Sequence, residues 1–402
     1  MMLQGKKIVL GVTGGIASYK AAELTREFVR KGADVMVIMT KNAAEFVAPL
    51  TFRTLSGHPV YSDMFASTDN YNLAHISLAT FADILLIAPA TANIIGKIAA
   101  GLADDLLSTV VMATKAPVLI CPAMNTGMYE NPIVQENIRK LTAGGYMFME
   151  PGYGELACAW EGRGRLPDVS EIVEEVESIL TEKDLFGEKI LVTAGPTREP
   201  FDPVRYITNY SSGKMGYALA IAARRRGANV VLVSGPVSLP VPRGITVVSV
   251  SSAVEMRNAV MEHLKASTVI IKAAAVADYR PDVRSESKIK KRPGPLTLTL
   301  ARNPDIIAEI GKKKGKRILV GFAVETENLT INAQVKLFDK NMDLIVANDV
   351  TQVGAGFGYD TNIIRILDRD SGQQELPVMD KMEAADRILD RIRDIIIARK
   401  RK

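Results

Sequence analysis

The sequence predicts an α/β protein built from two doubly wound, three-layer domains whose sheets are mostly parallel. A strand, a glycine turn, an amphipathic helix and a second strand follow one another at the amino terminus, and the same pattern returns near Lys189. Other segments are almost continuously apolar, which is typical of parallel strands buried on both faces. The length of 402 residues fits two or three domains.

The amino-terminal half begins with the first of these units. Its helix is predicted over 16–31, because apolar side chains recur every three or four positions there, and Gly32 ends it. A second helix over 169–180 closes this half. Buried strands are expected over 7–12, 35–39, 81–89 and 117–122.

The carboxy-terminal half repeats the unit and extends it. One helix is predicted over 215–226, and a final helix over 382–398 has the same apolar spacing. The charged stretch 181–188 is the predicted linker, so the domains are expected to span 1–183 and 184–402. Strands are expected over 189–193, 229–234, 246–250, 268–275, 318–322 and 344–347.

The composition is that of a packed globular protein, with 47% hydrophobic and 24% charged residues, which excludes a disordered or low-complexity chain. Two cysteines cannot form a disulfide framework, so we expect a reducing, cytoplasmic location. The first residues lack a signal-peptide pattern. No segment approaches the roughly 18 apolar residues of a spanning helix, so no membrane association is expected.

The net charge is +5, and much of the basic excess lies in one segment. Residues 284–317 contain eleven Lys or Arg against three Asp or Glu. Such a local field favours an anionic partner, which leaves a nucleic acid, a phosphate-rich nucleotide or plain solvation open.

A glycine turn opens the first predicted helix. Backbone N–H groups and the helix dipole at Gly14-Gly15-Ile16-Ala17-Ser18 favour an anion. The spacing matches neither the dinucleotide fingerprint nor a Walker loop, so a single phosphate fits better than a pyrophosphate. The alternative is a turn that needs glycine only for its geometry.

Three polar residues lie near predicted strand ends. His75 precedes the strand expected over 81–89, and Asn125 follows the strand over 117–122, where its amide can hold a carboxylate. Cys158 lies in the glycine-rich segment 152–165, a composition typical of a movable flap. We expect Cys158 to be exposed and reactive, whereas Cys121, inside an apolar strand, should be buried and inert. A hydrogen-bonded core histidine is the alternative for His75.

These segments carry a resemblance. The motifs are T-G-G-I-A in the first turn, A-P-A-T-A-N at 88–93, P-A-M-N before residue 126, and L-A-C in the flap. The first half resembles the flavin-containing cysteine decarboxylases. Nearly the whole chain resembles the bacterial bifunctional phosphopantothenoylcysteine decarboxylases and phosphopantothenate–cysteine ligases, with a flavodoxin- or Rossmann-like flavin domain followed by a Rossmann-like ligase domain. Ala159 and Tyr129 depart from the glycine and tryptophan that are common in this family.

The resemblance implies bound FMN and a decarboxylase site. His75 would act as base, Asn125 would hold the substrate carboxylate, and Cys158 would donate a proton. The flavin would supply the electron sink that lets the carboxylate leave as CO2. The resemblance places FMN against Gly14, Gly15, Ile16, Ala17, Ser18, Thr40, Thr91, Ala92 and Asn93.

The carboxy-terminal half carries a second set of polar residues. Ser211-Ser212-Gly213 at a helix start can bind a phosphate or merely cap the helix, and Arg205 and Asn209 just before it add donors that a cap does not need. Asp278 ends a strand, Lys288 begins a basic run, and Lys336 and Lys340 are one helical turn apart.

The resemblance implies that this half is a CTP-dependent ligase. Arg205 and Asn209 would hold phosphopantothenate and its activated form, while Lys288 would neutralise charge on the transferring phosphate. Mg2+ normally assists such chemistry, but no metal-ligand spacing is visible, so its ligands stay unnamed. The resemblance places CTP against Asp278, Lys288, Asn303, Pro304, Asp305, Ile306, Phe322, Lys336 and Lys340.

Together these features predict a two-activity enzyme of coenzyme A biosynthesis. The second domain would join 4′-phosphopantothenate to L-cysteine through an acyl-cytidylate, and the first would decarboxylate the product to 4′-phosphopantetheine. The family resemblance also implies self-association, as trimers through the flavin domain and dimers through the ligase domain. No single residue distinguishes CTP from ATP.

Three other functions are disfavoured by the sequence. An NAD(P)-linked reductase is disfavoured because the dinucleotide fingerprint is absent from both halves. A flavoprotein that only binds other proteins would not need His75, Asn125 and Cys158. A nucleic-acid binder is disfavoured because the basic run lacks interleaved aromatic residues.

Overall fold

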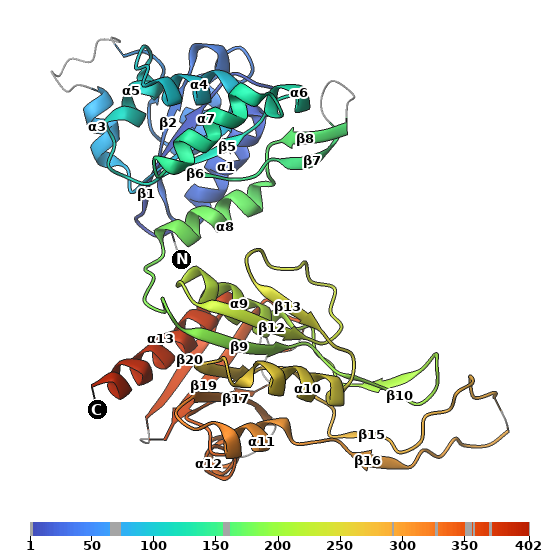
Figure 1. The fold of residues 1–402 in the computed structure, drawn as a ribbon. Helices are drawn as coiled ribbons and strands as arrows, with labels where there is room; N and C mark the ends of the chain where they lie inside the picture. Colours follow the sequence, from blue (N-terminus) through green and yellow to red (C-terminus); the bar gives the residue numbers. More distant parts are fainter. Residues whose placement is uncertain are drawn as a thin grey trace. The chain divides into compact units, whose positions relative to one another are not determined.

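The computed structural model describes residues 3–64, 74–155, 161–291, 293–325, 329–349, 356, 358–369 and 372–401. The chain divides into two compact units, Met1–Thr181 and Glu182–Lys402 (Figure 1). Each unit is described by itself below.

The amino-terminal unit is a three-layer α/β fold around a six-stranded parallel sheet. The strand order is β3-β2-β1-β4-β5-β6, so the chain reverses its progress across the sheet between β1 and β4. The strands are β1 Lys7–Val12, β2 Asp34–Met39, β3 Val60–Tyr61, β4 Ile84–Ala90, β5 Val118–Pro122 and β6 Met147–Phe148. Adjacent carboxyl ends at such a reversal form a crevice in which ligands bind.

Helices cover both faces of this sheet. One face packs under α1, α2 and α8, and the other under α3, α4, α5 and α7, each through its own apolar cluster. The helices are α1 Ser18–Arg30, α2 Pro49–Ser56, α3 Ala74–Phe81, α4 Ala92–Ala100, α5 Leu106–Ala113, α6 Thr126–Tyr129, α7 Pro132–Ala143 and α8 Val169–Leu180, with a 3-10 turn at Lys41–Ala43. The three-layer prediction is therefore confirmed for this unit, and Gly32, at a φ of 86°, follows the last turn of α1 as expected.

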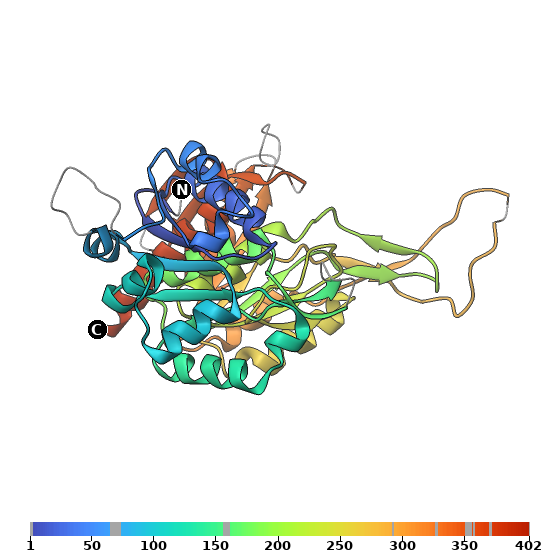
Figure 2. The same cartoon turned by 90° about the horizontal axis from the view of Figure 1, so that it is seen from above.

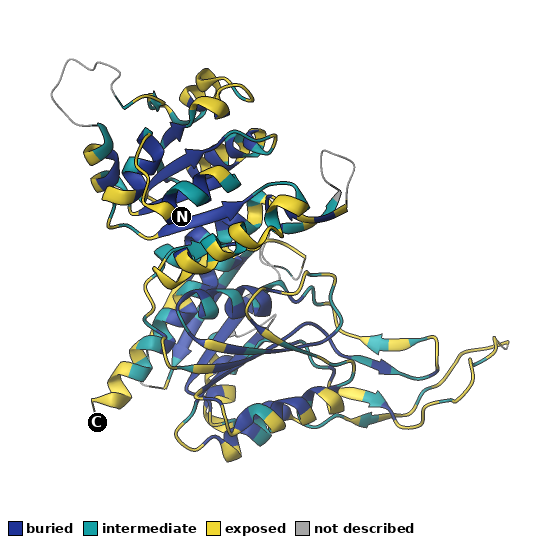
Figure 3. Ribbon diagram, turned by 45° about the horizontal axis from the view of Figure 1, so that its top comes forward, coloured by how far each residue is buried: buried dark blue, intermediate teal, exposed yellow. Residues whose placement is uncertain are grey.

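The carboxy-terminal unit has the same architecture with an extended sheet. Its strand order is β13-β12-β9-β14-β17-β18-β19-β20, and only the pairs β18–β19 and β19–β20 are antiparallel. The strands are β9 Lys189–Ala194, β12 Asn229–Ser234, β13 Thr246–Ser249, β14 Val269–Lys272, β17 Ile318–Glu325, β18 Leu344–Asp349, β19 Thr361–Asp368 and β20 Gln373–Asp380. Helices α9 and α13 cover one face, and α10, α11 and α12 the other. They are α9 Lys214–Arg225, α10 Ala253–Leu264, α11 Ile306–Lys313, α12 Leu329–Asp339 and α13 Lys381–Lys400. In both units the buried residues, which are dark blue in Figure 3, lie along the sheet.

Two strand pairs project from this unit as arms. The pairs are β10 Arg198–Pro200 with β11 Tyr206–Thr208, and β15 Tyr279–Pro281 with β16 Leu300–Arg302. Both arms extend to the same side of the unit (Figure 2). They are joined, because Ser285 N donates to the Phe201 carbonyl at 3.0 Å.

The structure corrects one local prediction. The strand expected over 81–89 starts only at Ile84, because Phe81 ends helix α3. A short apolar run can be buried as helix or strand alike, and here it contains both. In the segment 152–165, the described residues form an antiparallel pair, β7 Gly152–Glu155 and β8 Glu161–Arg165, and its role as a movable flap stays a prediction.

None of the helices in the described part of the chain combines the length and the hydrophobicity that a bilayer crossing requires.

Candidate functional site

A cavity of about 670 Å³ opens at the carboxyl edge of the amino-terminal sheet. Its walls come from the turn after β1, the start of α4, the segment after β5 and the strand β8. The predicted residues that line it are Gly14, Gly15, Ile16, Ala17, Thr91 and Asn125. The turn and the P-A-M-N motif, more than 100 residues apart, thus meet in one site.

The turn is held by its neighbours in a fixed shape. The Thr13 hydroxyl donates to the Pro89 carbonyl at 2.8 Å and accepts from the Thr91 N–H at 3.1 Å, which ties the ends of β1 and β4 together. Gly14 packs on Asn42, and a Cβ atom there would lie 2.8 Å from the Asn42 carbonyl oxygen. At Gly15 a Cβ would have only one ordinary contact, at 3.7 Å to Thr91. Gly14 is needed for packing, and Gly15 borders open space.

Two hydroxyls beside the turn behave differently. The buried Ser18 hydroxyl lies 2.8 Å from the Thr13 carbonyl and 2.6 Å from the Gly15 carbonyl, so it holds the turn from inside. The Thr40 Oγ1 is buried and has no hydrogen-bond partner among the described residues. A buried hydroxyl left alone is unfavourable, and a polar ligand at this edge would relieve it. Ala92 and Asn93 begin α4 beside Thr91, and they do not line the cavity, nor do Ser18 and Thr40.

Asn125 is positioned by strand β8. Its amide oxygen accepts from the Gly127 N–H at 2.8 Å, so the amide NH2 is the end that can donate to a carboxylate. The neighbouring Met124 N–H donates to the Gly164 carbonyl of β8 at 2.9 Å. A Cβ on Gly164 would collide with the Met124 carbonyl oxygen, and its φ of 144° also requires glycine. Strand β8 therefore fixes the backbone that carries Asn125.

Sequence reasoning missed the two cations of this cavity, Lys20 and Arg165. The Lys20 side chain is 13% exposed, and its Nζ lies 3.7 Å from an Asp168 carboxylate oxygen. The sequence feature that could have indicated Lys20 is its position in the first turn of the helix that follows the glycine turn.

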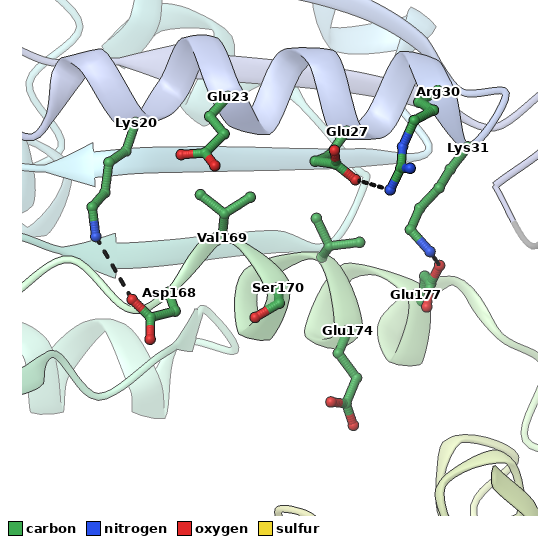
Figure 4. A pocket seen from close by; sticks show the side chains of 11 residues that line it. Lys20, Glu23, Glu27, Arg30, Lys31, Asp168, Val169, Ser170, Glu174 and Glu177 are labelled. Carbon is green, nitrogen blue, oxygen red and sulfur yellow. Dashed lines mark hydrogen bonds and ion pairs between the residues drawn. The ribbon is translucent and has the colours of Figure 1, made fainter. Parts of the chain in front are cut away.

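Lys20 also borders a groove between α1 and α8 (Figure 4). The charges deeper in this groove are paired with one another: Lys31 Nζ lies 2.9 Å from Glu177, and Arg30 lies 2.6 Å from Glu27. The groove is therefore a set of surface ion pairs.

His75 is not among the residues that line the cavity. His75 lies in the first turn of α3, half-buried, and in Figure 1 α3 lies across the unit from β7 and β8. Cys158 lies outside the described residues. Cys121 is fully buried, as predicted, and burial raises the pKa of its thiol well above the usual range.

A second, smaller cavity of about 160 Å³ opens at the carboxyl edge of the other sheet. It lies beside the end of β14, the middle of β17 and the start of β18, and between the helices α11 and α12. The predicted nucleotide residues that line it are Asp278, Asn303, Pro304, Asp305, Ile306, Phe322, Lys336 and Lys340. Lys288 is the exception.

Asp305 and Asn303 organise this cavity. The Asp305 carboxylate caps α11 by accepting from the Ala308 N–H at 3.1 Å, and it pairs with Lys340 Nζ at 2.9 Å. Burial alone would raise the pKa of Asp305, but these two partners outweigh burial and hold the pKa below its usual value. The Asn303 amide donates to the Ala277 carbonyl at 2.9 Å, and the Asn303 N–H donates to the Asp278 carbonyl at 2.8 Å.

Lys272 also lines this cavity, and sequence reasoning missed it. It is the last residue of β14, half-buried. Burial, aided by repulsion from Lys340, lowers the pKa of Lys272 to about 8. The sequence feature that could have indicated Lys272 is that it is the single charged residue inside the apolar run 268–275.

Arg205, Asn209 and Lys288 lie apart from the cavity. Arg205 Nη2 lies 2.6 Å from the buried Asp202 carboxylate and 2.9 Å from the Ile289 carbonyl, which anchors the second arm one residue from the exposed Lys288. This ion pair holds the pKa of Asp202 below its usual range. The Asn209 amide donates to the Val276 carbonyl at 3.1 Å, two residues before Asp278.

Metal ligands are not grouped in the described ranges. No three His, Cys, Asp or Glu side chains there lie close enough together to hold an ion.

The comparisons with known proteins cover both units. A family described as "Flavoprotein" matches residues 1–181, and one described as "DNA/pantothenate metabolism flavoprotein C-terminal domain" matches residues 185–396. The coenzyme A biosynthesis bifunctional protein CoaBC of Bacillus subtilis (strain 168) is 50% identical over 395 residues, which are 97% of each chain. The protein of the same name from Escherichia coli (strain K12) is 46% identical over 397 residues, 98% of each chain.

Solved structures match the units separately. The crystal structure of the C-terminal domain of a CoaBC protein is 43% identical and covers 54% of this chain and 100% of its own, with a TM-score of 0.48. A PPC decarboxylase mutant complexed with pantothenoylaminoethenethiol is 31% identical and covers 43% of this chain and 97% of its own, with a TM-score of 0.41.

Proposed function

The chain belongs to the family of coenzyme A biosynthesis bifunctional proteins, and we propose that its two cavities are the sites of two successive reactions. The enzyme has a flavoprotein decarboxylase domain and a ligase domain. The ligase joins 4′-phosphopantothenate to L-cysteine, and the decarboxylase converts the product to 4′-phosphopantetheine. One observation supports this proposal. The residues expected at the flavin line the cavity of the first sheet, and those expected at the nucleotide line the cavity of the second sheet.

The amino-terminal cavity suits FMN. The helix start and the room at Gly15 offer a cradle for the one phosphate of a flavin mononucleotide. The buried Thr40 hydroxyl, which has no partner among the described residues, lies outside the lining of this cavity but at the same edge of the sheet, where a polar ligand group would satisfy it. Bound FMN would supply the electron sink for loss of CO2. The Asn125 NH2 group would orient the substrate carboxylate, and Lys20 and Arg165 would favour anionic groups at the rim. Cys158 would return a proton to the product.

The carboxy-terminal cavity suits a nucleoside triphosphate, and CTP is the proposed one. The substrate carboxylate attacks the α-phosphorus of CTP and pyrophosphate leaves, which forms the acyl-cytidylate. The amine of cysteine then attacks the acyl carbon, and CMP leaves as the amide forms. Lys336 and Lys340 would neutralise the phosphates, and Mg2+ would enter with the nucleotide, coordinated mainly by phosphate oxygens and water.

Lys288 and Arg205 are proposed to act from the arms. Lys288 stays the proposed catalytic cation of the first half-reaction, and Arg205 and Asn209 the proposed contacts to phosphopantothenate. The hydrogen bond from Arg205 to the Ile289 carbonyl keeps Arg205 and Lys288 near one another.

Self-association is proposed through both units. The arms expose large apolar side chains, among them Val204 at 59% and Val283 at 79%, which suits burial against a second copy in a dimer. His75 lies away from the cavity of its own unit. A trimer in which a neighbouring copy brings its His75 to the flavin would complete the decarboxylase site.

The test is a complete reaction followed by mass spectrometry. Purified protein is mixed with 4′-phosphopantothenate, L-cysteine, Mg2+ and either CTP or ATP. We expect 4′-phosphopantetheine, CO2, CMP and pyrophosphate with CTP. Nucleoside diphosphate and inorganic phosphate in place of CMP and pyrophosphate would contradict the acyl-cytidylate.

A further inference from the structure

Lys272 lies at the position in the carboxy-terminal sheet where a ligand is expected. It ends β14, which is flanked by β9 and β17, and it pairs in register with Thr193 and Gly321. The chain reverses its progress across the sheet between β9 and β14, so Lys272 marks the crevice. Side chains alternate along a strand, and Lys272 therefore shares the face of Ile270, which packs in the apolar cluster under α10, α11 and α12.

The ammonium of Lys272 has no hydrogen-bond or ion-pair partner among residues 293–325, 329–349 and the rest of the described chain. The charged groups near it come from three directions. Asp278 follows its own strand, Asp305 caps α11, and Lys336 and Lys340 come from α12. The flanking strands contribute only Thr193 and Gly321, which carry no charge.

One of the two carboxylates near Lys272 is already engaged. Asp305 is paired with Lys340 at 2.9 Å and accepts from the Ala308 N–H. The other, Asp278, lies near Lys272 without a hydrogen bond to it in the described part of the chain. A half-buried cation without a partner is unfavourable, and a bound anion would remove that penalty.

We propose that Lys272 is the cation at the base of this cavity that binds a phosphate group of the nucleotide, and that it takes up a proton when the nucleotide binds. This inference rests on the proposed nucleotide site. It adds Lys272 to the residues of that site, and it adds the uptake of one proton to the binding reaction. Lys272 is a binding residue here, and it lines the cavity together with the apolar residues Ile307, Met342 and Ile345.

Proton uptake follows from the charge state of the empty site. With a pKa of about 8, Lys272 is partly neutral in the empty protein at pH 8 to 9. A phosphate partner favours the charged form and raises the pKa towards an ordinary lysine value. CTP affinity should therefore fall about tenfold between pH 7 and pH 9.

The experiment measures Mg–CTP binding to the full-length protein by calorimetry at pH 7, 8 and 9, without phosphopantothenate or cysteine. For Lys272→Met we expect about 30-fold weaker binding at pH 7 and no pH dependence. For Lys272→Arg we expect binding close to that of the unaltered protein at pH 7 and, again, no pH dependence, because the guanidinium stays charged. Lys312→Met, an exposed position on α11, is the matched control and should behave as the unaltered protein.

The unaltered protein gives an independent readout that no folding defect can affect. Calorimetry at pH 8.5 in two buffers of different ionisation enthalpy should report uptake of roughly 0.7 proton per CTP. Cytidine, which has no phosphate, should bind without uptake, and tripolyphosphate should bind with it.

The outcomes distinguish a failure of the proposed role of Lys272 from a failure of the proposed function of the whole cavity. Equal affinity and equal pH dependence in the unaltered protein and Lys272→Met, or proton uptake with cytidine, would overturn the role of Lys272 alone. If the unaltered protein binds neither CTP nor ATP at any pH, the proposed function fails and the inference fails with it.

Discussion

At the scale of single residues, two adjacent glycines have separate tasks. A Cβ at Gly14 would lie within 2.8 Å of the Asn42 backbone, whereas a Cβ at Gly15 would project towards the cavity. We expect Gly14→Ala to lower the free energy of unfolding by about 1–3 kcal/mol. Gly15→Ala should leave stability nearly unchanged and weaken flavin binding by roughly tenfold or more.

Flavin absorbance and thermal melts measure the two effects separately. Gly96→Ala on α4 is the matched control, because a Cβ there meets only an ordinary contact at 3.8 Å and lies outside the cavity. Full flavin content in Gly15→Ala would refute the assignment of this turn to the flavin.

A second residue prediction concerns the arm. We expect Lys288→Gln to slow CTP-dependent pyrophosphate release by roughly 100-fold without loss of bound flavin, because it removes a charge from the proposed transition state. Lys291→Gln, an exposed neighbour on the same arm, should have little effect. Unchanged pyrophosphate release in Lys288→Gln would remove that residue from the site.

The sequence predicts some residues of the two cavities and not others. Motif residues such as Gly15, Asn125 and Asp305 were found because their spacing is distinctive, and the structure brings them to the cavities. Lys20 and Lys272 were missed because a single lysine has no pattern. Only the packing around it reveals that it is buried in a site.

At the scale of elements, β8 is the part on which the decarboxylase site depends most. A Cβ on Gly164 of β8 would collide with the Met124 carbonyl oxygen, and Asn125 directly follows Met124. In Gly164→Ala the strand must shift away, and with it the backbone of Asn125. A displacement of about 1 Å can reduce a rate by roughly 100-fold, so we expect that loss in decarboxylation.

Ligase turnover, followed as CMP release, should be unaffected in Gly164→Ala. The control is Gly152→Ala on the partner strand β7, where a Cβ would lie at an ordinary 3.7 Å from the Arg165 carbonyl oxygen. Normal decarboxylation in Gly164→Ala would mean that β8 does not position Asn125.

Elements differ in how well the sequence predicts them. The bounds of Lys7–Val12, Asn229–Ser234 and Val169–Leu180 were predicted as observed, because long apolar or amphipathic patterns report burial directly. The arm strands β10, β11, β15 and β16 have three residues each and are partly exposed, so they carry no such pattern. Helix α3 was missed because a strand immediately follows it.

At the scale of the whole molecule, the chain is two separate folds joined near Thr181. Each unit has its own sheet and its own apolar clusters. We therefore expect a chain cut between Thr181 and Glu182 to give two fragments that fold independently. The first should bind flavin and decarboxylate added phosphopantothenoylcysteine, and the second should make that compound from its precursors.

Activity assays on the separate fragments, and on the two mixed together, check this expectation. A carboxy-terminal fragment that ligates only when the amino-terminal fragment is present would contradict the independence of the two units.

The central claim is that two mononucleotide sites lie at the carboxyl edges of two separate parallel sheets. The most direct measurement is an experimental structure of the protein with FMN and CTP. We predict a flavin phosphate at Gly15 and a triphosphate contacting Lys272 and Lys340. A flavin or a triphosphate bound anywhere other than these two edges would contradict the account.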